Sequence, residues 1–447
     1  MVHAILPPGN GRVMRADGGE AIRELQLELP LTEEAIRGLL IGDVVYLNAE
    51  VEPFVSVNPR NPNNWVATWQ QDRWSGGSAN GLITATTVDG GATWTRTAIP
   101  FSRCGGGTAG NGGDYQRATD PWVTFAPDGA VFQMALASSG GSFTAGSANA
   151  MLVSHSTDGG RTWGPVSTLI RDEGQFFNDK NSITADPTDP RYVYAVWDRL
   201  GASGGGPAML ARSTDGGATW EGARAIHDPG QRSQTIGNVI AVLPNGTVVD
   251  VFTQIDYAVN APARATLNAL VSVDKGGNWS GPFRIADALA VGARDPDTGA
   301  SIRDGANLPQ VAVAPNGHLW VAWQDARFSG GAHDGIALAR SSDGGRTWSA
   351  PLQVRFRDFA RLTGYATTAL YYATPIIYSG TIIPEKWLWL YQLHPMYWVI
   401  QGFRWSLLGK GLQPEPYMLI PIGIILLIFI PGIFVFERAS RNIVDIQ

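Results

Sequence analysis

The sequence predicts a mainly β fold, a propeller of four-stranded blades followed by a helical membrane-spanning tail. Three observations carry this prediction. An octapeptide that reads Ser-Thr-Asp-Gly-Gly-Arg-Thr-Trp at residues 156–163 occurs five times, with slight variation, at steps of 57 to 69 residues. Strand-like segments of alternating apolar residues surround each copy, and two long uncharged segments follow the last one. A repeat of this length is typical of stacked β-sheet units, and uncharged stretches of about 20 residues are typical of membrane helices.

The octapeptide itself predicts a hairpin turn. The other copies span residues 87–94, 213–220, 272–279 and 341–348. An Asp side chain can accept backbone N–H groups, and Gly adopts the positive φ values that tight turns need. The final Trp begins the next strand and offers its sheet a large apolar face. We therefore expect structural rather than catalytic roles for the aspartates and tryptophans of these turns, which are Asp89, Asp158, Asp215, Asp274, Asp343, Trp94, Trp163, Trp220, Trp279 and Trp348.

These turns resemble the Asp-box (BNR) repeats of sialidase-like β-propellers. The resemblance covers residues 49–353. Each repeat reads strand, turn, strand, loop, strand, Asp box, strand, which describes a four-stranded antiparallel blade. Sialidase propellers have six blades, whereas five are recognisable here, so we expect an incomplete propeller.

Composition and charge argue against nucleic-acid binding and against a fold held together by disulfides or cysteine-bound metal. The chain has 447 residues and a formal net charge of −6, and this mild acidity argues against a nucleic-acid partner. Cys104 is the single cysteine, so neither a disulfide framework nor a cysteine-rich metal site is predicted. No motif predicts a cofactor or a metal ion. Residues 1–8 lack the basic and apolar segments of a signal peptide.

We assign residues 1–48 to a separate N-terminal segment. From residue 20 onward the pattern predicts strands and a short helix, for which Thr32 is the expected N-cap. Residues 29–34, Leu-Pro-Leu-Thr-Glu-Glu, and residues 42–45, Gly-Asp-Val-Val, resemble the start of the β-subunit of iron–sulfur fumarases and tartrate dehydratases. The arginine- and histidine-bearing segment of that family is absent, so no fumarase chemistry is implied. An ordinary strand–helix cap is the alternative.

Propeller topology predicts where a ligand site would lie. The start of the first strand and the end of the second strand of each blade share one face, whereas the Asp boxes lie on the opposite face. Polar side chains at those positions are candidates for a central ligand-binding pocket, and they are Arg73, Arg117, Asp120, Asp179, Arg199, Tyr257, Arg303, Asp304 and Arg327.

The sialidase resemblance raises the question of catalysis. It implies three arginines on the substrate carboxylate, a Tyr nucleophile assisted by Glu, and an Asp acid–base. Arginines are available in Arg73, Arg199, Arg303 and Arg327, but we expect no propeller glutamate, Glu52 included, to face the axis. Three interpretations stay open: structural Asp–Arg ion pairs between blades, a pocket for a carbohydrate or another ligand, and a working glycoside hydrolase. The missing Tyr–Glu pair favours a binding or structural role without sialidase turnover.

Residues 354–447 differ in character from the repeats. Residues 362–383 and 417–436 are uncharged, and each stretch is long enough to cross a lipid bilayer as a helix. Motifs such as Ile-Pro-Glu-Lys-Trp at 383–387 and Gly-Phe-Arg-Trp at 402–405 resemble the end of the permease subunit of ABC-type exporters of O-antigen, teichoic acid and other polysaccharides. The preceding helices of that subunit and any Walker-type loop are missing. The resemblance therefore implies an ABC ATPase partner only for a functional permease fragment.

The predicted location is the bacterial inner membrane, with a multi-pass tail. Arginines flank both outer ends of the two uncharged stretches, at Arg355, Arg357, Arg361, Arg438 and Arg441. The positive-inside rule then places both ends of the tail, and the attached propeller, in the cytoplasm. Asp-box proteins are, by family resemblance, mostly extracellular, so the two halves of the chain predict different sides of the membrane.

Three hypotheses accommodate these segments. The favoured one is a composite reading frame, because natural fusions join whole domains through linkers and here three incomplete segments adjoin without one. The second is a membrane-anchored binding propeller with a two-span anchor. The third is a glycoside hydrolase delivered to a polysaccharide export site, and a transmembrane subunit of an ABC-type polysaccharide transporter is a further alternative.

Overall fold

The computed structural model describes residues 12–13, 22–27, 44–47, 50–74, 76–295 and 298–354. Contacts divide the chain into one unit of residues 1–353 and a second of residues 354–447. The described part consists of strands and three short 3-10 helices, which confirms the prediction of a mainly β, propeller-like fold. The predicted helix after Thr32 and both predicted membrane spans lie outside the described residues. Among the residues that are described, no helix is long and apolar enough to span a bilayer.

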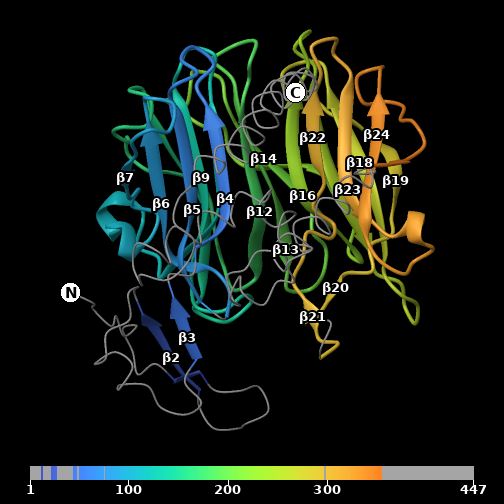
Figure 1. Cartoon of the computed structure of the whole chain (residues 1–447), viewed down its shortest axis with the longest axis horizontal. Helices are drawn as coiled ribbons and strands as arrows, with labels where there is room; N and C mark the ends of the chain where they lie inside the picture. The colour runs from blue at the N-terminus through green and yellow to red at the C-terminus, as the bar shows by residue number, and fades with distance from the viewer. Residues whose placement is uncertain are drawn as a thin grey trace, which may run out of the picture. The chain divides into compact units, whose positions relative to one another are not determined.

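Five four-stranded antiparallel blades follow one another along the chain, from the blue blade 1 to the orange blade 5 in Figure 1. Blade 1 contains β4 (Val51–Val57), β5 (Trp65–Arg73), β6 (Ala79–Thr87) and β7 (Thr95–Thr97). Blade 2 contains β8 (Arg117–Phe125), β9 (Val131–Ser139), β10 (Ala148–Ser156) and β11 (Ser167–Glu173). Blade 3 contains β12 (Phe176–Ala185), β13 (Val193–Gly201), β14 (Ala208–Ser213) and β15 (Arg224–His227). Blade 4 contains β16 (Ser233–Val242), β17 (Val248–Asp256), β18 (Arg264–Ser272) and β19 (Ser280–Ala288). Blade 5 contains β22 (Gln310–Val313), β23 (Leu319–Asp325), β24 (Gly335–Ser341) and β25 (Leu352–Gln353).

A few short elements complete the described fold. A single pairing of Ala79 with Ala118 joins blades 1 and 2 into one sheet. A small hairpin of β20 (Ala293–Arg294) and β21 (Ser301–Ile302) connects blades 4 and 5. The 3-10 helices are η1 (Arg103–Gly105), η2 (Ala109–Asn111) and η3 (Arg327–Ser329). Near the N-terminus, β1 (Arg12–Val13), β2 (Ile22–Leu27) and β3 (Val44–Leu47) form a three-stranded sheet in which β2 and β3 are parallel.

The hydrophobic core lies between neighbouring blades. Phe132, Met134 and Trp197 belong to one buried cluster between blades 2 and 3, and Tyr194 and Ile240 belong to another between blades 3 and 4. Strands of blades 2 to 4 are buried on both faces, so their apolar residues run on without the alternation of a half-solvated strand. Burying each large apolar side chain in this way contributes roughly 1.5–3 kcal/mol.

Each Asp box closes the turn between the third and fourth strands of its blade. In blade 3, Asp215 accepts the Ser213 hydroxyl at 2.8 Å and the Thr219 amide at 2.9 Å, and its second oxygen accepts the Thr219 hydroxyl at 2.6 Å. The Ser213 hydroxyl in turn accepts the Gly217 amide at 2.8 Å. Equivalent bonds occur in the other four boxes, except that in blade 4 the side-chain amide of Asn278 donates in place of a Thr hydroxyl. The bonds from Thr93 hold the pKa of Asp89 at about 2. The Asp carboxylate is thus engaged in hydrogen bonds within its own turn.

The glycine at the fifth position of the box also packs against the preceding blade in blades 2 to 5. A Cβ atom placed on Gly217 would lie 2.3 Å from Cε1 of Phe132 in blade 2, and one on Gly160 would lie 2.5 Å from Cγ2 of Val66 in blade 1. The equivalent glycines of blades 4 and 5, Gly276 and Gly345, approach Tyr194 and Val249 less closely, with a Cβ at 3.3 and 3.2 Å. Only glycine allows this approach together with the positive φ of the turn. The Asp box is therefore both a hairpin turn and a blade-to-blade contact.

Candidate functional site

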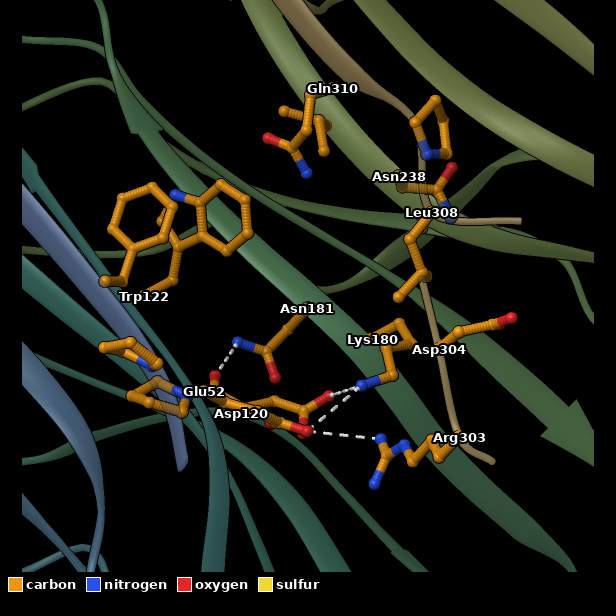
Figure 2. A pocket seen from close by; sticks show the side chains of 16 residues that line it. Glu52, Asp120, Trp122, Lys180, Asn181, Asn238, Arg303, Asp304, Leu308 and Gln310 are labelled. Atoms are coloured by element: carbon orange, nitrogen blue, oxygen red, sulfur yellow. Dashed lines mark hydrogen bonds and ion pairs between the residues drawn. The ribbon is translucent and has the colours of Figure 1, made fainter. Parts of the chain in front are cut away.

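A cavity of about 310 Å³ lies where the innermost strands of the five blades converge (Figure 2). Its volume falls at the lower end of the range of small-molecule sites, roughly 300–1,000 Å³. Strands β4, β8, β12 and β16 and the segment before β22 supply its lining. The polar side chains used below are Glu52, Asp120, Lys180, Asn181, Asn238 and Arg303.

A repeated backbone irregularity aims these side chains. The pairing register shifts between Val51 and Phe54 in β4, and equivalent shifts occur in β8, β12 and β16. Inside each shift one residue has a left-handed φ: 53° at Glu52, 50° at Asp120, 43° at Lys180 and 68° at a glycine in β16. Bulges re-aim side chains, and left-handed non-glycine residues concentrate at functional sites. The bulges therefore present two carboxylates and an ammonium to the cavity.

These charged groups form one network. The Lys180 ammonium lies 3.1 Å from Oδ2 of Asp120 and 4.0 Å from Oε1 of Glu52. The Arg303 guanidinium lies 3.2 Å from the same Glu52 oxygen, so it joins the segment before β22 to β4 (Figure 2). Two cations thus face two carboxylates, which leaves this network without net charge when all four groups are ionised.

Burial and neighbouring charges separate the pKa values of the acidic groups. Burial, and then the charge of Asp120, raise the pKa of Glu52. Burial also opposes ionisation of Asp120, but the charge of the Lys180 ammonium and hydrogen bonds from Thr119, Lys180 and Glu52 outweigh it, and the pKa of Asp120 lies below its ordinary value. Burial followed by the Asp120 charge raises the pKa of Asp179 to about 6. Burial raises the pKa of Asp198, opposite Asp179 in the β12–β13 pairing, well above its ordinary value.

Two amides line the cavity with unused acceptors. Within the described part of the chain, Oδ1 of Asn181 and Oδ1 of Asn238 are buried and accept no hydrogen bond. Nδ2 of Asn181 donates to the backbone carbonyl of Asp120 at 3.0 Å, which fixes the orientation of this amide. An unsatisfied buried acceptor costs about 1–3 kcal/mol. A ligand that donates hydrogen bonds would recover this cost.

The remaining wall is apolar and aromatic. Phe54 and Trp122 stack with ring centroids 4.0 Å apart, and both rings line the cavity together with Val239, Leu308 and Pro309. An aromatic wall opposite amides and charges suits a ligand that has one apolar face and several polar groups.

The candidates predicted from the sequence fall into two groups. Asp120, Arg303 and Asp304 line the cavity, and Asp179 is packed beside it at the bulge of β12. The other candidates are not among the described residues that line it. These are Arg73, whose guanidinium donates to the Trp74 carbonyl; Arg117, which lies over the Trp74 ring; Arg199, paired with Asp172; Arg327, paired with Asp325; and Tyr257, which is exposed.

The expectation that Glu52 would not face the axis is wrong. The left-handed φ of this residue turns the side chain into the cavity, and strand alternation alone does not reveal such a turn. Asn181 and Asn238 were also missed. A signal was present: the left-handed residues of the innermost segments, Asn307 included, precede the Asp of their own box by 35 to 38 residues. Aligning the repeats on their boxes would have found them.

The described residues contain no group of three or more His, Cys, Asp or Glu side chains placed to hold a metal ion.

Comparison with known proteins gives partial matches. No protein-family model matches the chain. Two O-antigen export system permeases of Klebsiella pneumoniae are 26% and 27% identical to it over 95 residues, which is 21% of this chain and 36% of each relative. The chain thus spans about a third of the length of these curated relatives.

Solved structures similar to this chain include glycoside hydrolases. A Hadza microbial sialidase has 17% identity and a TM-score of 0.41, over 65% of this chain and 57% of its own. The Penicillium chrysogenum alpha-L-arabinanase complexed with arabinobiose has 17% identity and a TM-score of 0.44, over 67% and 80%. The GH93 alpha-L-arabinofuranosidase of Fusarium graminearum has 14% identity and a TM-score of 0.45, over 68% and 81%.

Proposed function

We propose that the central cavity binds an uncharged saccharide and that the chain is a membrane-attached carbohydrate-binding propeller. The observation that carries the proposal is the pair of buried, unused amide oxygens of Asn181 and Asn238. Sugar hydroxyls are hydrogen-bond donors that would satisfy both acceptors. The C–H face of a sugar ring would pack on Trp122 and Phe54, which line the same cavity.

The charge arrangement favours an uncharged ligand over a sialoside. A sialoside carboxylate needs free cations, but Lys180 and Arg303 are already paired with Asp120 and Glu52. Of the arginines considered for a carboxylate clamp, Arg303 alone belongs to the described lining of the cavity. An anionic sugar would therefore have to displace an existing ion pair, which a neutral sugar leaves intact.

Hydrolysis by the carboxylates of the cavity is less well supported than binding. Glycosidases with two carboxylates stabilise a positively charged, oxocarbenium-like transition state. Here the Lys180 ammonium lies beside both Asp120 and Glu52, so it would repel positive charge developing between them. We therefore propose binding without turnover, and a glycoside hydrolase remains the alternative.

Membrane attachment is part of the same proposal and rests on the sequence. Residues 362–383 and 417–436 are uncharged and long enough to span a bilayer, and both lie outside the described residues. A two-span anchor in the bacterial inner membrane would hold the propeller at the bilayer surface.

A glycan array that displays neutral and acidic oligosaccharides, arabinobiose and sialyllactose among them, tests the binding proposal on the full chain. We expect retention of neutral glycans and none of sialyllactose. Calorimetry with a retained glycan should show affinity reduced about tenfold or more in Asn181→Ala and Asn238→Ala, because each removes a buried ligand contact of about 1.4 kcal/mol or more. Asn316→Ala, outside the cavity lining, is the matched control.

Three results would contradict the proposal. The first is retention of acidic glycans alone, and the second is retention of none. The third is unchanged affinity in both cavity variants while their melting temperatures stay at the wild-type value. Release of a reducing sugar from a retained glycan would favour the hydrolase alternative.

A further inference from the structure

The two buried amides of the cavity each have a fixed orientation. Asn181 is 4% exposed and Asn238 is 1% exposed, and each follows the left-handed residue of its bulge, Lys180 or Gly237. A side-chain amide has an acceptor oxygen and a donor nitrogen, and the groups around it decide which of the two is left for a ligand. In both residues the neighbours engage the nitrogen and leave the oxygen.

The orientation of Asn181 is set by a backbone carbonyl of the neighbouring blade. Its Nδ2 donates to the carbonyl of Asp120 at 3.0 Å. A backbone carbonyl can only accept, so the atom that faces it must be the amide nitrogen. Rotating the amide would place two oxygens against each other and leave both without a donor. Oδ1 of Asn181 is therefore held as an acceptor in the cavity lining.

The orientation of Asn238 is set by a hydroxyl whose hydrogen is already engaged. The Thr235 hydroxyl donates to the Gly206 carbonyl at 3.1 Å, so it can only accept from the Asn238 amide, whose Nδ2 lies 3.5 Å from it. The backbone carbonyl of Asn238 accepts the Ser182 hydroxyl at 2.8 Å, which ties this residue of β16 to β12. Oδ1 of Asn238 is thus held as a second acceptor.

We infer that Asn181 and Asn238 select free hydroxyl groups, so that the cavity rejects saccharides in which the contacted hydroxyls are O-acetylated or O-methylated. The inference rests on the proposed saccharide binding and names the class of saccharide. A hydroxyl can donate to either Oδ1, whereas an ester or ether oxygen can only accept. A blocked hydroxyl would therefore leave a buried acceptor unpaired on the protein. Sites built to hydrogen-bond a hydroxyl reject analogues that lack its donor much more strongly than an apolar pocket rejects a missing methylene.

The two amides contact different hydroxyls. Asn181 belongs to β12 and lies beside Asp120, whereas Asn238 belongs to β16 and lies beside Leu308 (Figure 2). Each acceptor therefore has surroundings of its own in the cavity. Blocking one hydroxyl should weaken binding through one amide only, and blocking both should weaken it further.

The test compares free and blocked hydroxyls on the full chain. The array displays each neutral glycan, arabinobiose among them, once with free hydroxyls and once fully O-acetylated. We expect retention of the free forms alone. Calorimetry then compares a retained glycan with its monodeoxyfluoro analogues, in which fluorine replaces one hydroxyl at a time with little change in size. Affinity should fall about tenfold or more at two of the hydroxyls, because each replacement leaves a buried acceptor unpaired.

Leucine variants assign each hydroxyl to its amide. Leucine has nearly the shape of asparagine but no acceptor, so Asn181→Leu should abolish the preference for the parent glycan at one hydroxyl, and Asn238→Leu should abolish it at the other. The ratio of the two affinities is compared within each variant, so a general loss of affinity does not affect it. Gln310→Leu is the matched control, because Gln310 is an exposed amide of the same lining whose oxygen water can satisfy. It should keep both preferences.

The outcomes separate this inference from the proposed function. Retention of no glycan in either form would contradict saccharide binding and this inference together. Equal retention of free and O-acetylated forms, or equal affinity of the wild-type chain for a glycan and all its fluoro analogues, would overturn the inference alone, and neither result depends on a variant that folds. Preferences that persist in both leucine variants would overturn the assignment to Asn181 and Asn238.

Discussion

Replacing Gly217 by alanine tests the contact between Asp box and neighbouring blade most directly. Gly217 has a φ of 84°, and a Cβ at this position would lie 2.3 Å from Cε1 of Phe132. Phe132 is fully buried between blades 2 and 3, so its ring has no free space into which to move. The added methyl group therefore strains the backbone and overpacks the core at the same time.

The two effects can be given separate magnitudes. Holding an L-residue in the left-handed region costs about 1–2 kcal/mol. Overpacking a well-packed core costs about 1–3 kcal/mol. Gly217→Ala should therefore lower the free energy of unfolding by about 2–5 kcal/mol, a large share of the roughly 5–15 kcal/mol that stabilises an ordinary domain.

Two neighbouring glycines provide the controls. Gly216 has a φ of 73° and its nearest contact is the Pro190 carbonyl at 3.6 Å, so Gly216→Ala carries the backbone cost without the clash. Gly222 lacks a left-handed φ and has nothing within 4 Å, so Gly222→Ala should be near neutral. Urea unfolding of the full-length variants, followed by circular dichroism, ranks the three. If Gly217→Ala is no less stable than Gly216→Ala, the blade-to-blade contact does not exist as described.

Three further predictions concern pH, the membrane and the ends of the propeller. The pKa of Asp179 is raised to about 6, so the stability that protonated Asp179 contributes is fully present below pH ~4 and is lost as pH rises through about 6. Asp179→Asn should remove about 3 kcal/mol of this pH dependence of the unfolding free energy. Identical stability–pH curves for the variant and the wild type would refute this prediction. Residues 354–447 fused to a soluble reporter should sediment with membranes, and recovery in the supernatant after ultracentrifugation would contradict the two-span tail. Residues 49–353 alone should aggregate or melt broadly, because the faces of blades 1 and 5 are exposed, whereas a monodisperse monomer with one sharp transition above roughly 65 °C would show that five blades suffice.

Much of the fold was determined by the sequence because its signals are local. An Asp box satisfies its hydrogen bonds within eight residues, as Asp215 does with Ser213 and Thr219, so the octapeptide is recognisable without knowledge of its neighbours. The spacing of the five boxes then implies five blades, since each turn must join two strands of one sheet. Charge placement also identified Asp120, Arg303 and Asp304, which lie at the entry to innermost strands.

The rest of the cavity lining was decided by tertiary structure. Glu52 faces the cavity because a bulge in β4 reverses the direction that strand alternation assigns to it. Pro53 beside it marks the bulge in the sequence, but not the direction in which the side chain points. Arg199 could in principle bind a ligand carboxylate, but its guanidinium donates two hydrogen bonds to Asp172, 27 residues earlier, and it does not line the cavity. Such outcomes depend on which side chains several blades bring together. A local pattern determines a turn, whereas only the packed blades determine where a buried charge finds its partner.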